Sequence, residues 1–269
     1  MNNKKMTYAG VGVNYDEMDP FKRLAQLAGR ETAKNISRLG FSEVEMSRGE
    51  SAYLMDAGDH YVAHVEEGLG TKSLVADAMY RLTRKSYYDH IAQCTVAMIV
   101  NDMITLGALP LSVAMHLAVG ASGWFGDENR CHDLIDGWKK ASDLARCTWG
   151  GGETPTLKDV VHPEAAVLSG SAVGVVKPKS RLIHAANIRH GDAIVIIGSS
   201  GIHANGLTLA REIAGKLPNG YLTKLGDGRL YGEALLAPTT IYVPLIEDCF
   251  NEGVNIHYAV ISRATVGVS

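Results

Sequence analysis

Closely spaced cysteines, long apolar runs and clusters of basic residues are all missing from this chain of 269 residues. Its four cysteines are Cys94, Cys131, Cys147 and Cys249, and none of them forms a Cys-x-x-Cys pair. This excludes a zinc knuckle and a thioredoxin-like redox motif. Scattered thiols suit a reducing compartment, so we expect a cytoplasmic protein.

No apolar stretch is long enough to span a bilayer, and the polar start of the chain carries no signal-peptide core. We therefore expect no membrane partner. The net charge is −3, from 26 Lys and Arg against 29 Asp and Glu. Without a concentrated basic surface, we also expect no nucleic-acid partner.

Hydrophobic residues make up 46% of the chain and charged residues 20%, which is typical of a globular protein. Predicted strands and helices interleave, so the expected class is mixed α and β. A polar, proline-containing break, "KPKSRL" at 177–182, is the best domain boundary. We expect an N-terminal domain over 1–177 and a C-terminal domain over 178–269. Strands are expected at 60–66, 111–119, 165–176 and 193–197, and helices at 20–39, 87–110, 127–145 and 207–214.

The stretch "GSSGIHANG" at 198–206 lies between the apolar run 193–197, read as a buried strand, and a predicted helix. Backbone N–H groups converge at such a helix N-terminus and favour an anion. His203 and Asn205 add side-chain donors. Leu207 stands where a P-loop has lysine, so the loop is not a Walker A motif. The alternative is a structural turn capped by Asn205.

The stretch "EGLGTK" at 67–72 is a second candidate phosphate contact. Its glycines let the backbone approach a ligand closely, and Lys72 supplies a compact positive charge. Glu67 offers an oxygen ligand for Mg²⁺. The alternative is a charged turn after a strand.

Two further stretches contain acids. Asp102, in "VND" at 100–102, lies in an apolar helical run, so burial beside a metal or a base competes with a position on an exposed face. "GGGET" at 150–154 predicts a flexible loop carrying Glu153 and Thr154; alone, a helix C-cap running into a turn explains it better. The histidines other than His203, including His116, lack ligand spacing and are interpreted as structural or solvated.

Taken together, the order of the motifs is more informative than any one of them. "YAGVGV", "EGLGTK", "VAMIVNDMITLGALPL", "GGET", "SAVGVV", "SSGIHANGLTLAR" and "APTTIYV" follow one another along the chain. This order resembles the phosphoribosylformylglycinamidine cyclo-ligases, the aminoimidazole ribonucleotide synthetases of purine biosynthesis, from about residue 7 to residue 260.

The resemblance implies a two-domain α+β fold and a homodimer in which N-terminal sheets pair across the axis. It implies an enzyme that uses ATP and Mg²⁺ to phosphorylate a formyl amide oxygen of a small ribonucleotide. An amidine nitrogen then closes the imidazole ring, forming a C–N bond and releasing phosphate. Such chemistry depends mostly on positioning and charge neutralisation.

The resemblance also implies roles for particular residues. The metal ligands would be Glu67, Asp102 and Glu153. The catalytic residues would be His203, Asn205 and Lys72, with His203 meeting the developing negative charge. The nucleotide and phosphate contacts would be Gly68, Gly70, Thr71, Lys72, Gly151, Gly152, Thr154, Ser199, Ser200, Gly201 and Gly206.

Some positions depart from the family pattern. Glu67 replaces an aspartate, Cys94 replaces an acid eight residues before Asp102, and Gly10 and Asn14 replace early acids. A thiol is a poor Mg²⁺ ligand, so we expect a lower charge around the metal. The chain ends in "HYAVISRATVGVS" without the family's His-x-Thr-Gly-Gly-Gly stretch, which predicts an incomplete C-terminal domain and weak or absent cyclisation activity.

Two alternatives to a cyclo-ligase stay open. One is another ATP-using enzyme of the superfamily, although a selenophosphate synthetase would carry an early reactive cysteine and a thiamine-monophosphate kinase more aspartates. The other is a non-catalytic or divergent nucleotide-binding paralogue.

Overall fold

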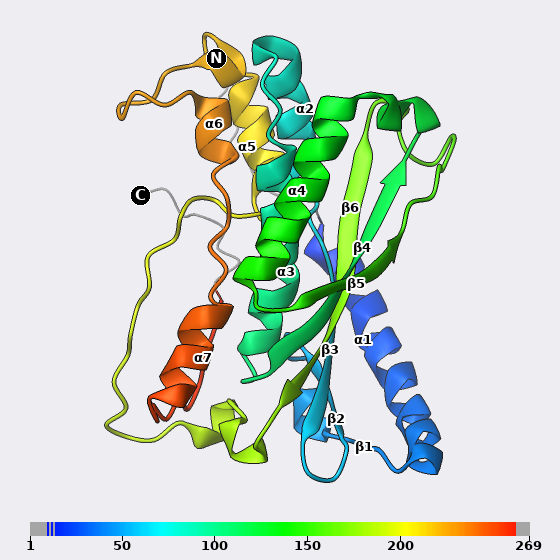
Figure 1. Cartoon of the computed structure of the whole chain (residues 1–269), viewed down its shortest axis with the longest axis vertical. Coiled ribbons are helices and arrows are strands. Elements are labelled where there is room, and N and C mark those ends of the chain that lie inside the picture. Colours follow the sequence, from blue (N-terminus) through cyan, green and yellow to red (C-terminus); the bar gives the residue numbers. More distant parts are fainter. Residues whose placement is uncertain (1–9, 11, 13, 262–269) are drawn as a thin grey trace.

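A single six-stranded sheet forms the centre of the fold in the computed structural model, which describes residues 10, 12 and 14–261 (Figure 1). The strands lie in the order β1-β2-β3-β6-β4-β5, and only β4 and β5 run parallel. Their bounds are Ser42–Glu43 (β1), Tyr53–Asp56 (β2), Tyr61–Gly68 (β3), Leu109–Val119 (β4), Thr148–Glu153 (β5) and Ala166–Val176 (β6). The mixed α and β class predicted from the sequence is confirmed.

Helices cover one face of this sheet. They are α2 (Lys72–Thr83), α3 (Tyr88–Ile104) and α4 (Glu128–Leu144). Every residue of α3 from 94 to 104 is buried, because α3 lies between the sheet and the other helices. Gly137 lets α4 approach closely, since a Cβ there would lie 2.5 Å from the Cα of Asp89.

The opposite face of the sheet is more open. Along β6, Ala166 and Leu168 face the helices and are buried, whereas Val167 and Val173 point the other way and are 48% and 43% exposed. This alternation follows from the two-residue period of a strand. The sheet therefore presents one buried face and one face with exposed apolar side chains.

The N-terminal helix α1 (Tyr15–Thr32) packs loosely, and none of its residues is buried. It continues into a short 3₁₀ helix, Ala33–Leu39, so the helix expected at 20–39 is found with an earlier start and a tighter final turn. Further 3₁₀ helices are Glu45–Ser47, Ser122–Gly126, Lys179–Arg181, Ala185–Asn187 and Gly220–Leu222.

The glycine-rich stretch "GGGET" corrects one expectation. It is not a flexible loop, because residues 148–153 form β5 beside β4. A Cβ on Gly152 would lie 2.2 Å from the carbonyl oxygen of Met115, and one on Gly150 would lie 2.2 Å from the Ser112 hydroxyl. The glycines therefore permit the close approach of two strands rather than a loose turn.

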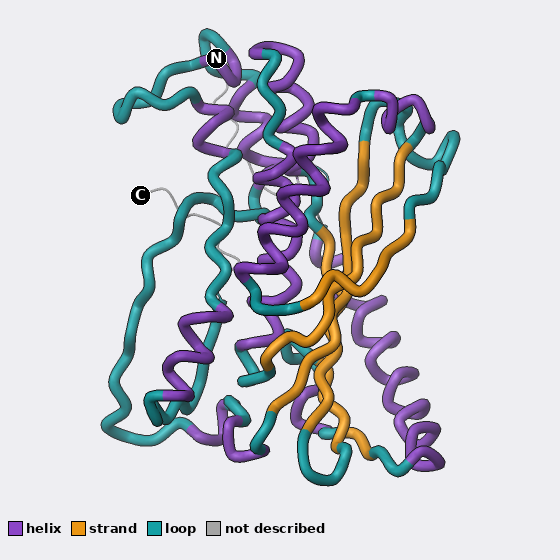
Figure 2. The backbone as a smooth tube through the Cα atoms, in the orientation of Figure 1, coloured by secondary structure: helices purple, strands orange, loops and turns teal. Residues whose placement is uncertain are grey.

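After β6 the described chain is helical or irregular, and its one β-bridge joins Lys224 to Leu230 (Figure 2). The helices are α5 (Leu207–Ala214), α6 (Tyr231–Leu235) and α7 (Val243–Asn251). None of the helices in the described residues has the length and apolar character needed to cross a membrane.

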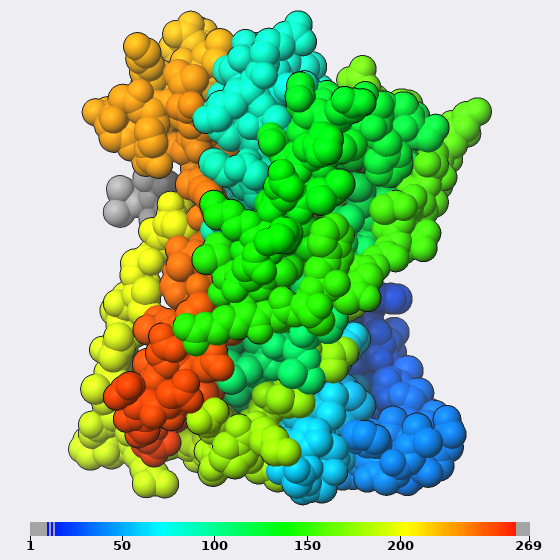
Figure 3. Space-filling view, viewed as in Figure 1, coloured from blue at the N-terminus to red at the C-terminus, as the bar shows by residue number. Residues whose placement is uncertain are grey.

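The prediction of a strand at 193–197 is wrong, because this segment forms no strand in the structure. Ile194, Val195 and Ile196 are 89%, 81% and 88% exposed, and the segment runs along the edge of the molecule as a separate column (Figure 3). A strand needs a neighbour for its backbone hydrogen bonds, and no described segment pairs with this one. The apolar sequence alone therefore does not produce a buried strand here.

Candidate functional site

The strand register aligns two of the predicted motifs in one row across the sheet. Gly68 on β3 lies opposite Ser169 on β6, Ser169 lies opposite His116 on β4, and His116 lies opposite Glu153 on β5. Residues directly opposite each other project to the same side of a sheet. The "EGLGTK" and "GGGET" motifs, more than 80 positions apart in the chain, are therefore joined by Ser169 and His116 on the open face.

His116, interpreted from the sequence as structural or solvated, lies in the middle of this row. Its Nδ1 lies 3.2 Å from the Ser169 hydroxyl. In the sequence, the feature that points to this position is the place of His116 on the polar side of a predicted strand. The neighbours of His116 are on adjacent strands, and the register that aligns them cannot be deduced from spacing along the chain.

The three predicted metal ligands do not come together. Glu67 shares its side of β3 with Ala63 and Val65, which face the helices, whereas Glu153 projects to the open face. Asp102 lies on α3 and is only 3% exposed, so the exposed-face alternative for it is wrong. No group of three or more His, Cys, Asp or Glu side chains in the described part of the chain has the geometry of a metal site. The residues present do not by themselves fit a protein-only Mg²⁺ centre.

The turn from β3 into α2 places Lys72 in the interior. Gly70 has a φ of +71°, a conformation that favours glycine, and the following residues begin α2. Gly68 and Gly70 are exposed and Thr71 is half-buried, so the backbone of the turn is accessible. The Lys72 side chain, in contrast, is fully buried.

Lys72 contacts both the second anion loop and the segment that follows α6. Its Nζ donates to the carbonyl oxygen of His203 at 2.7 Å, to that of Ala237 at 2.9 Å and to the Sγ of Cys94 at 3.1 Å. The lysine predicted to touch phosphate is thus occupied by three protein acceptors. It joins α2 to chain more than 130 positions away.

The loop 198–206 folds around His203, which has a left-handed φ of +57°. Its Nε2 lies 2.9 Å from the Ser199 hydroxyl, and that hydroxyl also accepts from the backbone N–H of Gly201 at 3.2 Å. Burial, followed by the neighbouring Lys72 charge, lowers the pKa of His203 below its ordinary value of 6.5. The imidazole is therefore neutral at physiological pH.

The rest of this loop is fastened to the chain after α6. The Ser200 hydroxyl donates to the carbonyl oxygen of Pro238 at 2.8 Å and accepts from the N–H of Thr240 at 3.3 Å. Gly206, with a φ of +76°, is the N-cap of α5, and the side chain of Asn205 is half-buried just before it. The arrangement expected from the sequence, a glycine-containing loop entering a helix, is present without the preceding strand.

The remaining predicted contacts lie on β5 and directly after it. Gly151, Gly152 and Thr154 are exposed at the edge of the sheet, next to Glu153. The structure therefore separates the predicted residues into two groups. One group lies at the open face and the edge of the sheet, and the other lies around Lys72 and loop 198–206.

A stripe of polar side chains on α3 holds the "APTTIYV" segment at 237–243 against the helix. His90 Nδ1 lies 2.9 Å from the carbonyl oxygen of Leu236, and Gln93 donates to the carbonyl oxygen of Thr239 at 3.0 Å. Asn101 donates to the carbonyl oxygen of Thr240 at 2.8 Å and accepts from the N–H of Tyr242 at 2.9 Å. These bonds explain why a buried helix carries polar residues at this spacing.

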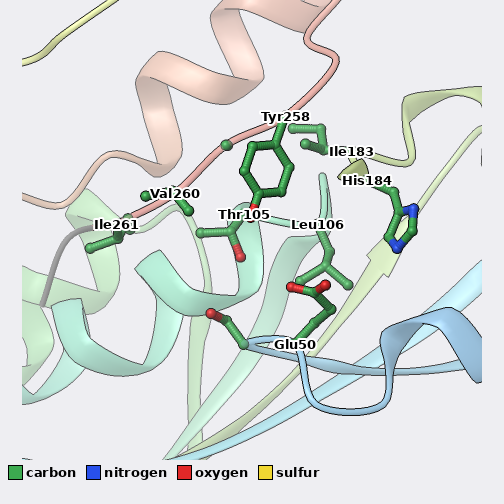
Figure 4. A pocket seen from close by; sticks show the side chains of 10 residues that line it. Glu50, Thr105, Leu106, Ile183, His184, Tyr258, Val260 and Ile261 are labelled. Carbon is green, nitrogen blue, oxygen red and sulfur yellow. The ribbon is translucent and has the colours of Figure 1, made fainter. Parts of the chain in front are cut away.

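A small cavity lies elsewhere, where the end of α3 meets the final described residues (Figure 4). Thr105, Leu106, Ile183, His184 and Tyr258 line it together with Glu50 and Val260. Its volume is about 50 Å³, far below the several hundred Å³ of typical ligand pockets, and no predicted site residue lines it.

Known proteins with similar sequences give the family. The family model of "AIR synthase related protein, N-terminal domain" matches residues 49–176. The phosphoribosylformylglycinamidine cyclo-ligase of Thermococcus kodakarensis is 36% identical over 253 residues, which cover 94% of this chain and 70% of the relative. That of Carboxydothermus hydrogenoformans is 34% identical over 253 residues, covering 91% of this chain and 68% of the relative.

The fold also has a solved counterpart. The structure of AaThiL complexed with AMPPCP and TMP aligns with a TM-score of 0.52 at 15% identity, over 75% of this chain and 56% of that one. At this identity the likeness concerns the fold alone. The extent and identity of the sequence matches assign the protein: this chain belongs to the phosphoribosylformylglycinamidine cyclo-ligase family.

Proposed function

We propose that this chain catalyses the ATP-dependent closure of formylglycinamidine ribonucleotide to aminoimidazole ribonucleotide. The observation that carries this proposal is the 30–36% identity to proteins named as cyclo-ligases over most of the chain. The same matches favour an enzyme over a non-catalytic paralogue.

The reaction needs an activated amide oxygen. Phosphorylation converts that oxygen, a poor leaving group, into a phosphate that departs when the amidine nitrogen attacks the carbon. The protein's contribution is to position the two reacting groups and to stabilise negative charge on the transferred phosphoryl group.

We place the charge-stabilising contacts at loop 198–206. The first N–H groups of α5 are donors of the kind that bind phosphate, and the Ser199 and Ser200 hydroxyls would have to turn from their carbonyl acceptors to join them. The neutral His203 ring would act as a hydrogen-bond partner rather than as a cation. The accessible backbone of Gly68, Gly70 and Thr71 is the second proposed nucleotide contact, and Gly151, Gly152 and Thr154 are a third.

Lys72 has a different proposed role from the one expected for a phosphate ligand. Two of its hydrogen bonds hold loop 198–206 and Ala237 in place, so it would act on catalysis by positioning that loop. Asn205, beside the N-cap of α5, stays a proposed contact of the same loop.

Mg²⁺ is proposed as a partner of the nucleotide. Proteins usually hold this ion through one or two carboxylates together with phosphate oxygens, which does not require a preformed cluster of three acids. Glu67 and Asp102, on the helix side of the sheet, are the candidates; Glu153 would need a separate role.

The domain division at residue 177 and the homodimer are also proposals. The boundary is supported by the end of β6 at Val176 and by the family match, which ends at the same residue. The dimer is supported by the open face of the sheet, where Val167 and Val173 are exposed.

The decisive experiment incubates the purified chain with formylglycinamidine ribonucleotide, ATP and Mg²⁺ and follows phosphate release and imidazole product together. We expect one phosphate to be released per imidazole ring closed.

His203→Ala should lower kcat on the order of a hundredfold if the loop stabilises the transferred group. His132→Ala, an exposed histidine on α4, is the matched control. Cyclisation kinetics unchanged in His203→Ala would reject the role of this loop, and ATP binding without product would reject the activity.

A further inference from the structure

A lysine and a cysteine share a buried site beside loop 198–206, and the proposed reaction gives the cysteine no role. Lys72 and Cys94 are both 0% exposed, and Lys72 Nζ lies 3.1 Å from Cys94 Sγ. No carboxylate forms an ion pair with Lys72 among the residues that the structure describes. An isolated buried ammonium is strongly unfavourable, so Lys72 is either neutral or paired with a negative charge other than a carboxylate.

The three hydrogen-bond contacts of the nitrogen match the three protons of an ammonium group. Two of its three acceptors are the carbonyl oxygens of His203 and Ala237, which have no proton to give. Lysine has three donors only as an ammonium group. The third donor then points at the sulfur of Cys94.

The sulfur, in turn, is surrounded by donors. Besides Lys72, the backbone N–H of Thr239 lies 3.3 Å from it and the Thr239 hydroxyl 3.4 Å. Its nearest recorded acceptor is the carbonyl oxygen of Ala237, at a long 3.8 Å. Three donors converging on one sulfur match the needs of a thiolate rather than a thiol.

A neutral arrangement competes with this one. A thiol proton on Cys94 would then point at a neutral amine on Lys72. The neutral amine then has two N–H groups, and these donate to the carbonyl oxygens of His203 and Ala237. This arrangement leaves the two Thr239 donors facing a weakly accepting S–H group, so it satisfies fewer buried polar atoms.

We propose that Lys72 and Cys94 form a buried ammonium–thiolate pair that fastens loop 198–206 and residues 237–240 to α2 and α3. Cys94 is a positioning residue in this arrangement. It supplies the negative charge, Lys72 donates one hydrogen bond to each of the two distant segments and a third to Cys94, and Thr239 completes the cluster. The holding of these segments therefore depends on the ionisation of one thiol.

The proton count on sulfur tests the pair without any mutation. The S–H stretching band in the Raman spectrum reports protonated thiols only, and the chain has four cysteines. We expect three equivalents of this band in the native protein at neutral pH, because one of the four is ionised. Full unfolding at the same pH should restore the fourth, since a solvated thiol is mostly protonated there.

Two single substitutions identify which cysteine lacks the S–H proton. Cys94→Ser should leave the native S–H band unchanged, whereas Cys131→Ser should remove one equivalent. Cys131 is the matched control because its burial raises its pKa and keeps it protonated. Four equivalents in the native wild type, or loss of one on Cys94→Ser, would overturn the proposal.

The fastening role has its own readout in amide hydrogen exchange of residues 203–206 and 237–240. Cys94→Ser should accelerate it on the order of tenfold or more, because a hydroxyl leaves the ammonium without a counter-charge. Cys94→Asp restores the charge and should return exchange to within about threefold of the wild type. Equal exchange in the serine and aspartate variants would show that size, not charge, matters at this position, and the proposal would fail. Should the serine variant not fold, aspartate alone decides: a folded, protected aspartate variant supports the pair, and an unfolded one contradicts it.

Discussion

At the scale of single residues, His203 has a protonation state that can be measured. Burial and the Lys72 ammonium both lower its pKa, so the folded protein binds this proton less tightly than the unfolded chain does. The resulting contribution to stability is complete above the unfolded pKa of about 6.5 and is lost as the pH falls towards the folded value. We expect the NMR titration midpoint of His203 to lie below the ordinary imidazole value of about 6.5.

The pH dependence of the unfolding free energy provides a second test of the His203 pKa. The loss of unfolding free energy between about pH 7.5 and about pH 5.5 should be smaller in His203→Gln than in the wild type, because glutamine does not titrate. A His203 midpoint at or above about 6.5 would contradict the lowered pKa of this ring.

Single residues also show the reach of sequence reasoning. The burial of Asp102 followed from its apolar surroundings, and the loop around His203 followed from glycine spacing. The place of His116 between Ser169 and Glu153 did not, because it depends on how three strands align. The partners of Lys72 were equally invisible, since they lie 22 to 165 positions away.

At the scale of elements, Asn101 makes α3 a support for the "APTTIYV" segment. Its side-chain amide satisfies one carbonyl oxygen and one N–H of an otherwise irregular chain. Asn101→Ala leaves both groups without their partner, which we expect to cost about 1–3 kcal/mol of unfolding free energy. Denaturant unfolding measures this change, with Asn35→Ala on the exposed surface as the control. Equal stability of the two variants would show that the segment is held by other contacts.

Elements with a clear period were the predictable part of the fold. β4, α4 and β6 lie within a few residues of their expected positions, because their apolar residues recur at strand or helix spacing. The helix expected at 87–110 is found as α3, but it ends at Ile104 and the last expected residues begin β4. β5 was missed because a run of glycines shows no hydrophobic period. It forms a strand because its glycines allow it to lie very close to β4. The run 193–197 had a strand pattern without a partner, and pairing cannot be read from one segment alone.

At the scale of the whole molecule, the open face of the sheet predicts self-association. Val173→Asp places a charge on this face and should shift the protein towards the monomer in light scattering, because burying an unpaired carboxylate at an interface is costly. Ile135→Asp is the matched control, since Ile135 is 48% exposed on the outer side of α4. A wild type that is monomeric at all concentrations, or a Val173→Asp variant that still dimerises, would exclude this face.

The exposed segment at 193–197 has a consequence for how the protein behaves in concentrated solution. It is uncharged, rich in β-branched residues and without backbone hydrogen bonds among the described residues, which are the properties of segments that stack into cross-β aggregates. Ile196→Lys should raise the concentration at which turbidity begins, whereas Val160→Lys, at a similarly exposed position outside this segment, should not. The colloidal stability of the purified protein would then be set by five residues that take no part in its core.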